Sequence, residues 1–370
     1  MKILFATGIY PPEIGGAASA VHDAALALVR IGHEVTVVTY GAQETTSEND
    51  SGIRVVRVSR RGSVLERYVR FAAQVRQASS EATCVCVTDI SSAGIPVRLA
   101  LLGKTVPVLY RLGGERAWEN AIQHKKIFVP LRRYWRERLG GFSQWCTEQQ
   151  YKIILGPVRQ IMVVSSLLRD CLVQIEPRWD KKIRVVPTRI RRVQGEKRQD
   201  AHTPRRFIFV GRFTVVKNLA FFVRALRRLA SESPSFECLF VGDGEEYALR
   251  ASELKSLSQV QMLGLKSREE THALLRTADV LVLPSITDVY PQVVIEALSM
   301  GVPVLMTSEH GLEPGFGGIQ EVDPENEEAW VKAMATLLSK ETYETLRRAI
   351  FIPNPVGETW AEVIIATLES

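Results

Sequence analysis

Short runs of consecutive apolar residues alternate along this chain with segments whose apolar residues follow a helical spacing. Residues 3–7 form the first run. After a loop rich in proline and glycine, Val21, Ala25 and Leu28 recur at intervals of three or four residues, and residues 34–39 form the next predicted strand. Continuous apolar runs are typical of strands in a parallel sheet, because helices cover both of its faces. The pattern therefore predicts a strand–helix–strand unit at the start of the chain.

The same alternation continues to the end of the chain and restarts once on the way. Further strands of the first half are predicted at residues 55–58, 84–87, 106–110 and 161–164. The restart predicts a strand at 207–210, a loop at 211–216, a helix at 219–229, and strands at 236–241, 261–263, 280–283 and 302–305. Strands that alternate with helices form open parallel sheets. The fold class is therefore α/β, with two similar Rossmann-like, doubly wound domains.

The length of 370 residues also fits two domains. Residues 1–187 are expected to form the first domain and residues 206–352 the second. Between them lies a linker at 188–205, within a stretch from 181 to 206 that holds ten Lys or Arg residues and two acidic ones. Residues 353–370 are expected to form a last helix that crosses back to the first domain.

Composition excludes several classes of protein. Apolar residues make up 46% and charged residues 24%, as in ordinary globular proteins, and the net charge of +6 is modest for a nucleic-acid binder. The five cysteines are scattered, so buried, reduced thiols are expected and neither a zinc site nor a disulfide framework. The first residues lack the features of a signal peptide, and no run approaches the roughly 18 apolar residues of a membrane span. A cytoplasmic protein is expected.

Two loops between a strand and the following helix are candidate phosphate sites. Gly15 and Gly16 would let a ligand approach the backbone at the start of a helix, although their spacing is not that of a dinucleotide-binding fingerprint. The equivalent loop of the second domain begins at Gly211 and carries Arg212 and Lys217. Cations are unfavourable near a helix N-terminus unless they share an anion, which favours a diphosphate site. The alternative is that Lys217 is solvated and Arg212 pairs with a carboxylate.

Two acidic residues lie around the following strand–loop–helix motif. Asp288 precedes the helix, and Glu296 lies within it between apolar neighbours, so it needs a partner if it is buried. Eight residues of helix would separate the carboxylates by about 12 Å, farther apart than a glycosidase pair. The spacing suits one carboxylate that holds a sugar and another that holds a ribose. The alternative is that Glu296 caps the helix or forms a structural ion pair.

The order and spacing of these motifs resemble the retaining glycosyltransferases of family 4, which have the GT-B fold. The motifs are Pro11-Pro12-Glu13-x-Gly15-Gly16, Gly32-His33-Glu34-Val35, Gly211-Arg212-x4-Lys217, Val241-Gly242-Asp243-Gly244, Ala278-Asp279-Val280, Leu283-Pro284-Ser285, and an acidic residue eight positions before Glu296-Ala297. The resemblance implies transfer of a sugar from a nucleoside-diphosphate donor, with UDP favoured over GDP, to a glycan, a lipid-linked molecule or a small molecule. It also implies front-face retention without a metal or another cofactor.

The resemblance assigns a role to each candidate residue. Arg212 and Lys217 would bind the diphosphate, Gly16 would donate a backbone N–H to it, Glu296 would bind the ribose and Asp288 would face the transferred sugar. The remaining donor-binding residues implied by the family are Gly15, Gly211, Gly242, Leu265, Val289 and Tyr290. On the acceptor side the chain departs from the family's usual His-Gly pair, and Arg111 or Glu115, beside Gly114, would replace the histidine.

A basic segment with interspersed aromatic residues follows this acceptor-side loop. Lys125, Lys126, Arg132, Arg133, Arg136 and Arg138 alternate with Ile127, Phe128, Val129, Leu131, Tyr134 and Trp135. It could bind an anionic membrane surface that carries lipid-linked acceptors, or it could be a solvated helix face whose aromatic residues pack on the core. Two further functions remain open, a nucleotide-sugar epimerase and a non-catalytic nucleotide-sugar-binding subunit. Nucleic-acid binding is disfavoured, because the basic linker lacks stacking aromatics.

Overall fold

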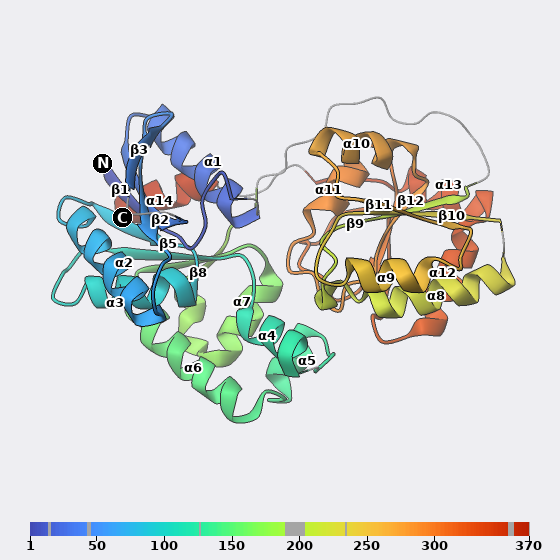
Figure 1. Ribbon diagram of the computed structural model, residues 1–370, viewed down its shortest axis with the longest axis horizontal. Coiled ribbons are helices and arrows are strands. Elements are labelled where there is room, and N and C mark those ends of the chain that lie inside the picture. Colours follow the sequence, from blue (N-terminus) through green and yellow to red (C-terminus); the bar gives the residue numbers. More distant parts are fainter. Residues whose placement is uncertain are drawn as a thin grey trace. The chain divides into compact units, whose positions relative to one another are not determined.

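The computed structural model describes residues 1–13, 16–42, 46–125, 127–188, 204–233, 235–353 and 359–369. The chain forms two compact units (Figure 1). The first unit comprises Met1–Glu115, Gly141–Thr188 and Gly357–Ser370, and the second comprises Arg116–Gly140 and Arg189–Val356. The segment Arg116–Gly140, which the sequence pattern places in the first domain, thus clusters with the second unit.

An eight-stranded sheet forms the centre of the first unit, in the order β3-β4-β2-β1-β5-β6-β7-β8. Its strands are β1 Lys2–Ala6, β2 Glu34–Gly41, β3 Thr46–Asp50, β4 Ile53–Ser59, β5 Cys84–Val87, β6 Val108–Leu112, β7 Gln160–Val163 and β8 Ile183–Val185. All neighbours are parallel except β3 and β4, which form an antiparallel pair at one edge. Six successive parallel pairs confirm the predicted doubly wound character.

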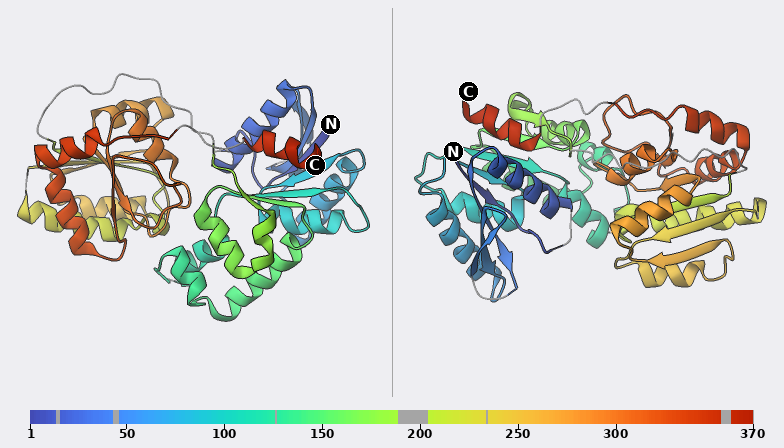
Figure 2. Two further views of the ribbon diagram at one scale, coloured as in Figure 1. Left: turned by 180° about the vertical axis from the view of Figure 1, so that it is seen from behind. Right: turned by 90° about the horizontal axis from the view of Figure 1, so that it is seen from above.

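Helices pack on this sheet (Figure 2). They are α1 Gly16–Arg30, α2 Val64–Ala78, the π-helical turn Ile90–Gly94 with α3 Ile95–Ala100, α6 Gly141–Leu155, α7 Ser166–Ile175, a 3-10 turn at Pro177–Lys182, and α14 Trp360–Glu369. Ser63 and Glu66 form a capping box at the start of α2, which satisfies two backbone N–H groups of its first turn.

The C-terminal helix α14 packs into the core of the first unit. Val363 and Ile364 are fully buried there, and the Trp360 ring meets Phe5 of β1 edge-on, with ring centroids 5.3 Å apart. Burial of a whole apolar helix face therefore attaches this last segment to a sheet formed by the first residues of the chain.

The second unit contains a six-stranded parallel sheet in the order β11-β10-β9-β12-β13-β14. Its strands are β9 Arg206–Val210, β10 Glu237–Val241, β11 Val260–Gly264, β12 Val280–Leu283, β13 Val304–Thr307 and β14 Ile319–Val322. Its helices are α4 Arg116–Lys125, α5 Leu131–Arg136, a 3-10 turn at Val215–Lys217, α8 Leu219–Glu232, α9 Tyr247–Leu254, α10 Arg268–Thr277, α11 Gln292–Ser299, α12 Glu327–Leu337 and α13 Lys340–Arg348. A cluster of phenylalanines at 209, 213, 222 and 240 lies in its core.

Most predicted strands are present, and the differences have local causes. The strand predicted at 106–110 begins at Val108, after Pro107, and three strands, β3, β8 and β14, are not foreseen. Four of the five cysteines are buried and free, but Cys146 is exposed, which corrects the expectation for that residue. It lies on the outer face of α6, where no apolar run marks it as a core position. Residues 189–203, most of the predicted linker, lie outside the described residues.

Candidate functional site

Three loops of the second unit, after β9, β10 and β12, carry most of the predicted donor-site residues. Strand β9 lies between β10 and β12, and all three are parallel. Their carboxyl ends therefore meet at one edge of the sheet, which is where sheets of this kind bind ligands. Residues 211–218, 242–246 and 284–291 are brought together at this edge, although they are far apart in the sequence.

The loops after β9 and β10 are in direct backbone contact. The Gly211 N–H donates to the Val241 carbonyl at 3.0 Å, and the Phe213 N–H donates to the Asp243 carbonyl at 2.9 Å. Gly242 has a φ of +132°, and a Cβ atom there would lie 1.9 Å from the Gly211 carbonyl oxygen. Both the backbone conformation and the space require glycine. The predicted residues Gly211 and Gly242 thus shape the loops where a ligand would approach.

Lys217 and Asp288 form an ion pair at this edge. Lys217 Nζ lies 2.5 Å from Asp288 Oδ2, and the two side chains are 21% and 11% exposed. The loops that carry them are joined next to this pair, because the Ile286 N–H donates to the Val216 carbonyl at 2.9 Å. The structure thus brings together two residues that the sequence analysis chose separately.

Arg212 differs from Lys217 in its surroundings. Its side chain is exposed, and within the part of the chain that the structure describes it has no hydrogen bond or ion pair. The alternative interpretation expected the reverse, with Arg212 paired and Lys217 solvated. The ion pair is neutral, so among the described residues the Arg212 guanidinium leaves net positive charge at this edge of the sheet, which favours an anion.

Glu296 is held on α11 by a cation from the neighbouring helix. Arg268 Nη2 lies 2.8 Å from Glu296 Oε1, His272 Nε2 lies 3.7 Å from the same oxygen, and the Glu296 side chain is 19% exposed. The partner that a half-buried glutamate needs is therefore Arg268, at the start of α10. Among the other predicted donor-site residues, Leu265 is 72% exposed, and Val289 and Tyr290 are partly buried.

The glycine pair of the first unit is only partly described. Gly15 lies outside the described residues. Gly16 is exposed and is the first residue of α1, which follows β1 and its loop. Its position at a helix N-terminus matches the prediction, and its contact with a phosphate remains a prediction.

The acceptor-side candidates have partners inside the first unit. Glu115 is 2% exposed and accepts a hydrogen bond of 2.6 Å from the Tyr151 hydroxyl. The Arg111 guanidinium lies 5.0 Å from the centroid of the Trp360 ring and donates to the Thr188 hydroxyl at 3.1 Å. Gly114, which lies between Arg111 and Glu115 in the sequence, is half-buried. Arg111 thus joins strand β6 to the C-terminal helix and to Thr188, the first residue of the predicted linker.

Two of the three aromatic residues of the basic segment are buried in the second unit. Leu131, Tyr134 and Trp135 of α5 are each less than 5% exposed, and Arg133 forms an ion pair with Glu325 at 3.2 Å. This packing matches the second of the two interpretations of this segment for its aromatic side chains. Phe128 remains 52% exposed.

Two residues of this region were not found from the sequence. Thr287 is 2% exposed, and its hydroxyl accepts a hydrogen bond from the Leu131 backbone N–H at 2.9 Å. Glu309 accepts a hydrogen bond at its backbone carbonyl from the Asp288 N–H, and burial of its carboxyl raises its pKa above 4.5 against the opposing effect of Arg132. The only sequence signal for Thr287 is its position directly before Asp288.

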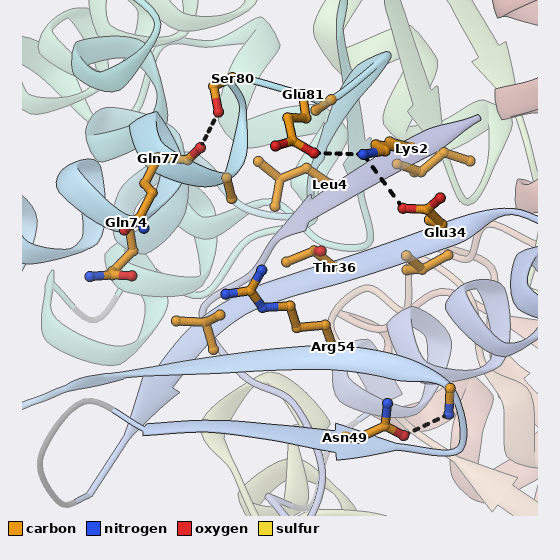
Figure 3. Close-up of a pocket in the computed structure, with 16 residues that line it drawn as sticks. Lys2, Leu4, Glu34, Thr36, Asn49, Arg54, Gln74, Gln77, Ser80 and Glu81 are labelled. Atoms are coloured by element: carbon orange, nitrogen blue, oxygen red, sulfur yellow. Dashed lines mark hydrogen bonds and ion pairs between the residues drawn. The ribbon is translucent and has the colours of Figure 1, made fainter.

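A separate cavity of about 490 Å³ lies in the first unit (Figure 3). It lies beside residues at the amino ends of β1, β2 and β4, opposite the edge where such sheets bind ligands. Lys2 lies between Glu81, at 2.5 Å, and Glu34, at 3.7 Å, and Arg54 lies on the same sheet face (Figure 3). The two cations and two carboxylates balance, so the cavity lacks the charge that marks the donor-site edge.

Comparison with known proteins identifies the class. The family described as "Glycosyl transferase 4-like domain" matches residues 15–189, and "Glycosyl transferases group 1" matches residues 204–340. An uncharacterized glycosyltransferase of Methanocaldococcus jannaschii is 25% identical over 84% of this chain and 82% of its own length. An amylovoran biosynthesis glycosyltransferase of Erwinia amylovora is 31% identical over 36% of this chain and 33% of its own.

Solved structures share the fold. Sucrose-phosphate synthase of Thermosynechococcus elongatus superposes with a TM-score of 0.70 at 18% identity, covering 100% of this chain and 98% of that one. A lipopolysaccharide outer core galactosyltransferase superposes with a TM-score of 0.67 at 15% identity, covering 95% and 94%. The protein is an α/β enzyme of two Rossmann-like domains. Its chain is a glycosyltransferase of the GT-B type.

The described residues also bear on membrane insertion and on metal binding. None of the helices in the described ranges is long and apolar enough to cross a membrane. Across those same ranges, no three His, Cys, Asp or Glu side chains are grouped so that they could hold a metal ion.

Proposed function

We propose that the enzyme transfers a sugar from a UDP-sugar to a glycan or lipid-linked acceptor with retention of anomeric configuration. The observation that carries this proposal is the exposed Arg212, which has no side-chain partner among the described residues, near the Lys217–Asp288 ion pair at the carboxyl edge of the second sheet. Negative charge develops on the diphosphate as it leaves, and fixed cations at that position stabilise the transition state.

The ion pair fits both halves of a bound sugar nucleotide. An ammonium group has three N–H donors, so Lys217 can bind a phosphate oxygen while it keeps Asp288 in place. Asp288 has two carboxylate oxygens, and only Oδ2 contacts Lys217. The other oxygen can accept hydrogen bonds from sugar hydroxyls. Asp288 is one methylene shorter than the glutamate usual in the family, and the close lysine contact fixes its direction.

The proposed reaction is a front-face displacement. The bond between the anomeric carbon and the phosphate oxygen breaks, and the acceptor oxygen forms its bond on the same face of the sugar. The acceptor proton passes to the departing phosphate oxygen, which leaves as a nucleoside diphosphate. Arg212 and Lys217 supply the positive charge in this scheme, so we propose that transfer does not require a metal ion.

Relatives support the donor and the acceptor class. An Anabaena protein of the same fold was solved in complex with UDP and glucose, and a trehalose-phosphate synthase of Burkholderia xenovorans is described as UDP-forming. Two relatives carry the name of a polysaccharide in their own names: the amylovoran biosynthesis glycosyltransferase and a colanic acid biosynthesis glycosyltransferase of Salmonella typhimurium. We therefore place the enzyme in the biosynthesis of a polysaccharide.

The deciding experiment is a panel of UDP-, GDP- and ADP-sugars. Each is scored for a rise in unfolding temperature and for slow release of the nucleoside diphosphate without acceptor. A true donor stabilises the folded protein by mass action and is also hydrolysed. A free isomer of the sugar nucleotide would indicate an epimerase. Binding of a sugar nucleotide without release of the nucleoside diphosphate, whichever acceptor is added, would indicate a non-catalytic subunit. Chelator in the assay tests metal independence, because it should leave turnover unchanged.

For lipid-linked acceptors we propose contact between the basic segment and an anionic membrane surface. Phe128, Arg132 and Arg136 are exposed on this segment although its other aromatic residues are buried. Such a surface combines an apolar side chain with cations, as membrane-surface segments do. Sedimentation with phosphatidylglycerol vesicles should weaken in Arg132→Glu/Arg136→Glu and not in Arg30→Glu/Arg61→Glu. Equal binding by both double variants would contradict the assignment.

A further inference from the structure

The segment Arg116–Gly140 interrupts the first unit and packs on the second. It contacts the rest of the second unit at several points along its length. Gln123 Nε2 donates to Glu245 at 2.9 Å, and Arg133 pairs with Glu325 at 3.2 Å. These two contacts are exposed, and exposed polar contacts contribute little to stability. The contact that combines burial with proximity to the donor site is the third one, between Leu131 and Thr287.

That third contact is a fully buried hydrogen bond. The Leu131 N–H donates to Thr287 Oγ1 at 2.9 Å, and the two residues are 0% and 2% exposed. Leu131 is the first residue of α5, and Pro130 before it provides no side-chain cap. The first N–H groups of a helix have no partner within the helix, so a buried one needs an outside acceptor. Thr287 supplies it from a loop more than 150 residues further along the chain.

Thr287 lies in a series of three consecutive residues that are each anchored. The Ile286 N–H donates to the Val216 carbonyl, and the Asp288 N–H donates to the Glu309 carbonyl, both at 2.9 Å. These two hydrogen bonds join backbone atoms, so substitution of the Ile286 or Asp288 side chain does not remove them directly. The anchor between them is a single side-chain hydroxyl, and it joins the Asp288 loop to α5.

The second anchor is also near α5. Arg132 and Arg136 of α5 lie close enough to the Glu309 carboxyl to oppose the rise in its pKa that burial causes. Glu309 is the residue whose carbonyl accepts the Asp288 N–H. One short helix therefore contacts the Asp288 loop directly through Thr287, and its arginines also act on Glu309, whose carbonyl accepts the Asp288 N–H.

We propose that Thr287 is a positioning residue of this glycosyltransferase, which through its hydrogen bond to the Leu131 amide holds the Asp288 carboxylate where the transferred sugar binds. The segment Arg116–Gly140 is then part of the donor site's support, although its sequence precedes that site by about half the chain. The catalytic consequence rests on the proposed function, in which Asp288 faces the sugar. The anchoring itself does not depend on that function.

Three variants test this role. Thr287→Val keeps the shape of the side chain and removes the acceptor, so the Leu131 N–H is buried without a partner. Thr287→Ser keeps a hydroxyl. The matched control is Thr39→Val, the same change at a threonine that is also fully buried, in the first unit, and whose hydroxyl has no hydrogen-bond partner among the described residues.

Hydrogen exchange measures the anchoring without any substrate. Thr287→Val should speed exchange roughly ten-fold or more in two peptides, one over residues 131–136 and one over residues 286–291, because a buried hydrogen bond is lost. Thr287→Ser should restore slow exchange in both, and Thr39→Val should leave both unchanged. Unchanged exchange at 286–291 in Thr287→Val would overturn the proposal, because α5 would then not hold the Asp288 loop.

Hydrolysis of UDP-glucose measures the catalytic consequence. Thr287→Val should lower kcat roughly ten-fold or more and leave the Kd of UDP within about three-fold, because a displaced catalytic group costs rate more than nucleotide affinity. Rescue by Thr287→Ser is expected. Equal loss in both variants, or wild-type kcat in Thr287→Val, would overturn the positioning role. If the wild type binds no donor of the panel, the proposed function fails, whereas the exchange result still decides the anchoring.

Discussion

Arg212→Ala and Lys217→Ala should both abolish most sugar transfer but should differ in their effect on stability. Lys217 Nζ lies 2.5 Å from the Asp288 carboxylate, and the pair is mostly buried, with 21% and 11% of the side chains exposed. Arg212 is exposed and, among the described residues, unpaired. Removal of the Lys217 side chain therefore leaves the mostly buried Asp288 carboxylate without its cation. Removal of the exposed Arg212 side chain breaks no ion pair among the described residues.

The magnitude follows from the degree of burial. Breaking a fully buried ion pair costs about 3–5 kcal/mol, and exposed pairs contribute about 0–1 kcal/mol. This pair lies between these limits, so Lys217→Ala should lower the free energy of unfolding by about 1–3 kcal/mol. For a unit of this size that is a fall in Tm of roughly 2–12 °C. Arg212→Ala should stay within about 0.5 kcal/mol of the wild type.

Two measurements on the same samples separate the effects. Thermal unfolding gives the stability, and release of UDP from UDP-glucose gives the turnover, which should fall about 100-fold in each variant. Lys255→Ala, an exposed lysine of the second unit, is the matched control and should change neither. Equal Tm values for the Arg212 and Lys217 variants would refute the stabilising ion pair. Wild-type turnover in both would refute the diphosphate-binding role.

Three further predictions concern groups around the site and the core. Burial raises the pKa of Glu309 above 4.5, so the stability from its bound proton is present below pH 4.5 and is lost as the pH rises through the raised value. Glu309→Gln should therefore unfold at a higher temperature than the wild type at pH 8 and at the same temperature at pH 4, and a constant difference would contradict this. Trp360→Ala removes a buried ring that packs on Phe5 and should lower the free energy of unfolding of the first unit, measured by urea denaturation, by about 3–5 kcal/mol. Trp145→Ala, at an exposed tryptophan, should not cause this loss. Asp279→Ala removes a buried acceptor of two backbone N–H groups, each at 2.8 Å, and should lower the free energy of unfolding by about 2–4 kcal/mol, with no Tm change counting against this role.

The strands of the two sheets could be predicted because parallel strands are covered on both faces. Such strands consist of continuous apolar residues, as at residues 84–87 and 280–283, and the pattern is visible without any tertiary information. Strand β3 at Thr46–Asp50 contains no apolar residue and pairs only at the edge of the sheet, so its pattern carries no such signal. Strands β8 and β14 are short and partly exposed, and polar residues interrupt their apolar ones, so neither forms a continuous apolar run.

The candidate site was only partly predictable. Residue type and position after a strand were enough to select Arg212, Lys217 and Asp288, because loops at the carboxyl ends of parallel strands meet at one edge. Loop geometry decides which of the two cations pairs with the Asp288 carboxylate, and in the structure it is Lys217. Thr287 could not be selected, because its role depends on a partner about half a chain away.

The sequence by itself determined the class of fold, the two-sheet organisation and the chemical types at the donor-site edge, since apolar periodicity and local motifs are encoded over a few residues. Only the tertiary structure decided that Arg116–Gly140 belongs to the second unit and which residues of the first unit α14 packs against. The packing of such a segment depends on which apolar surface it buries its own apolar side chains against. The hydrophobic effect has no direction, so the apolar character of Leu131 and Trp360 predicts that they are buried but not which residues they contact.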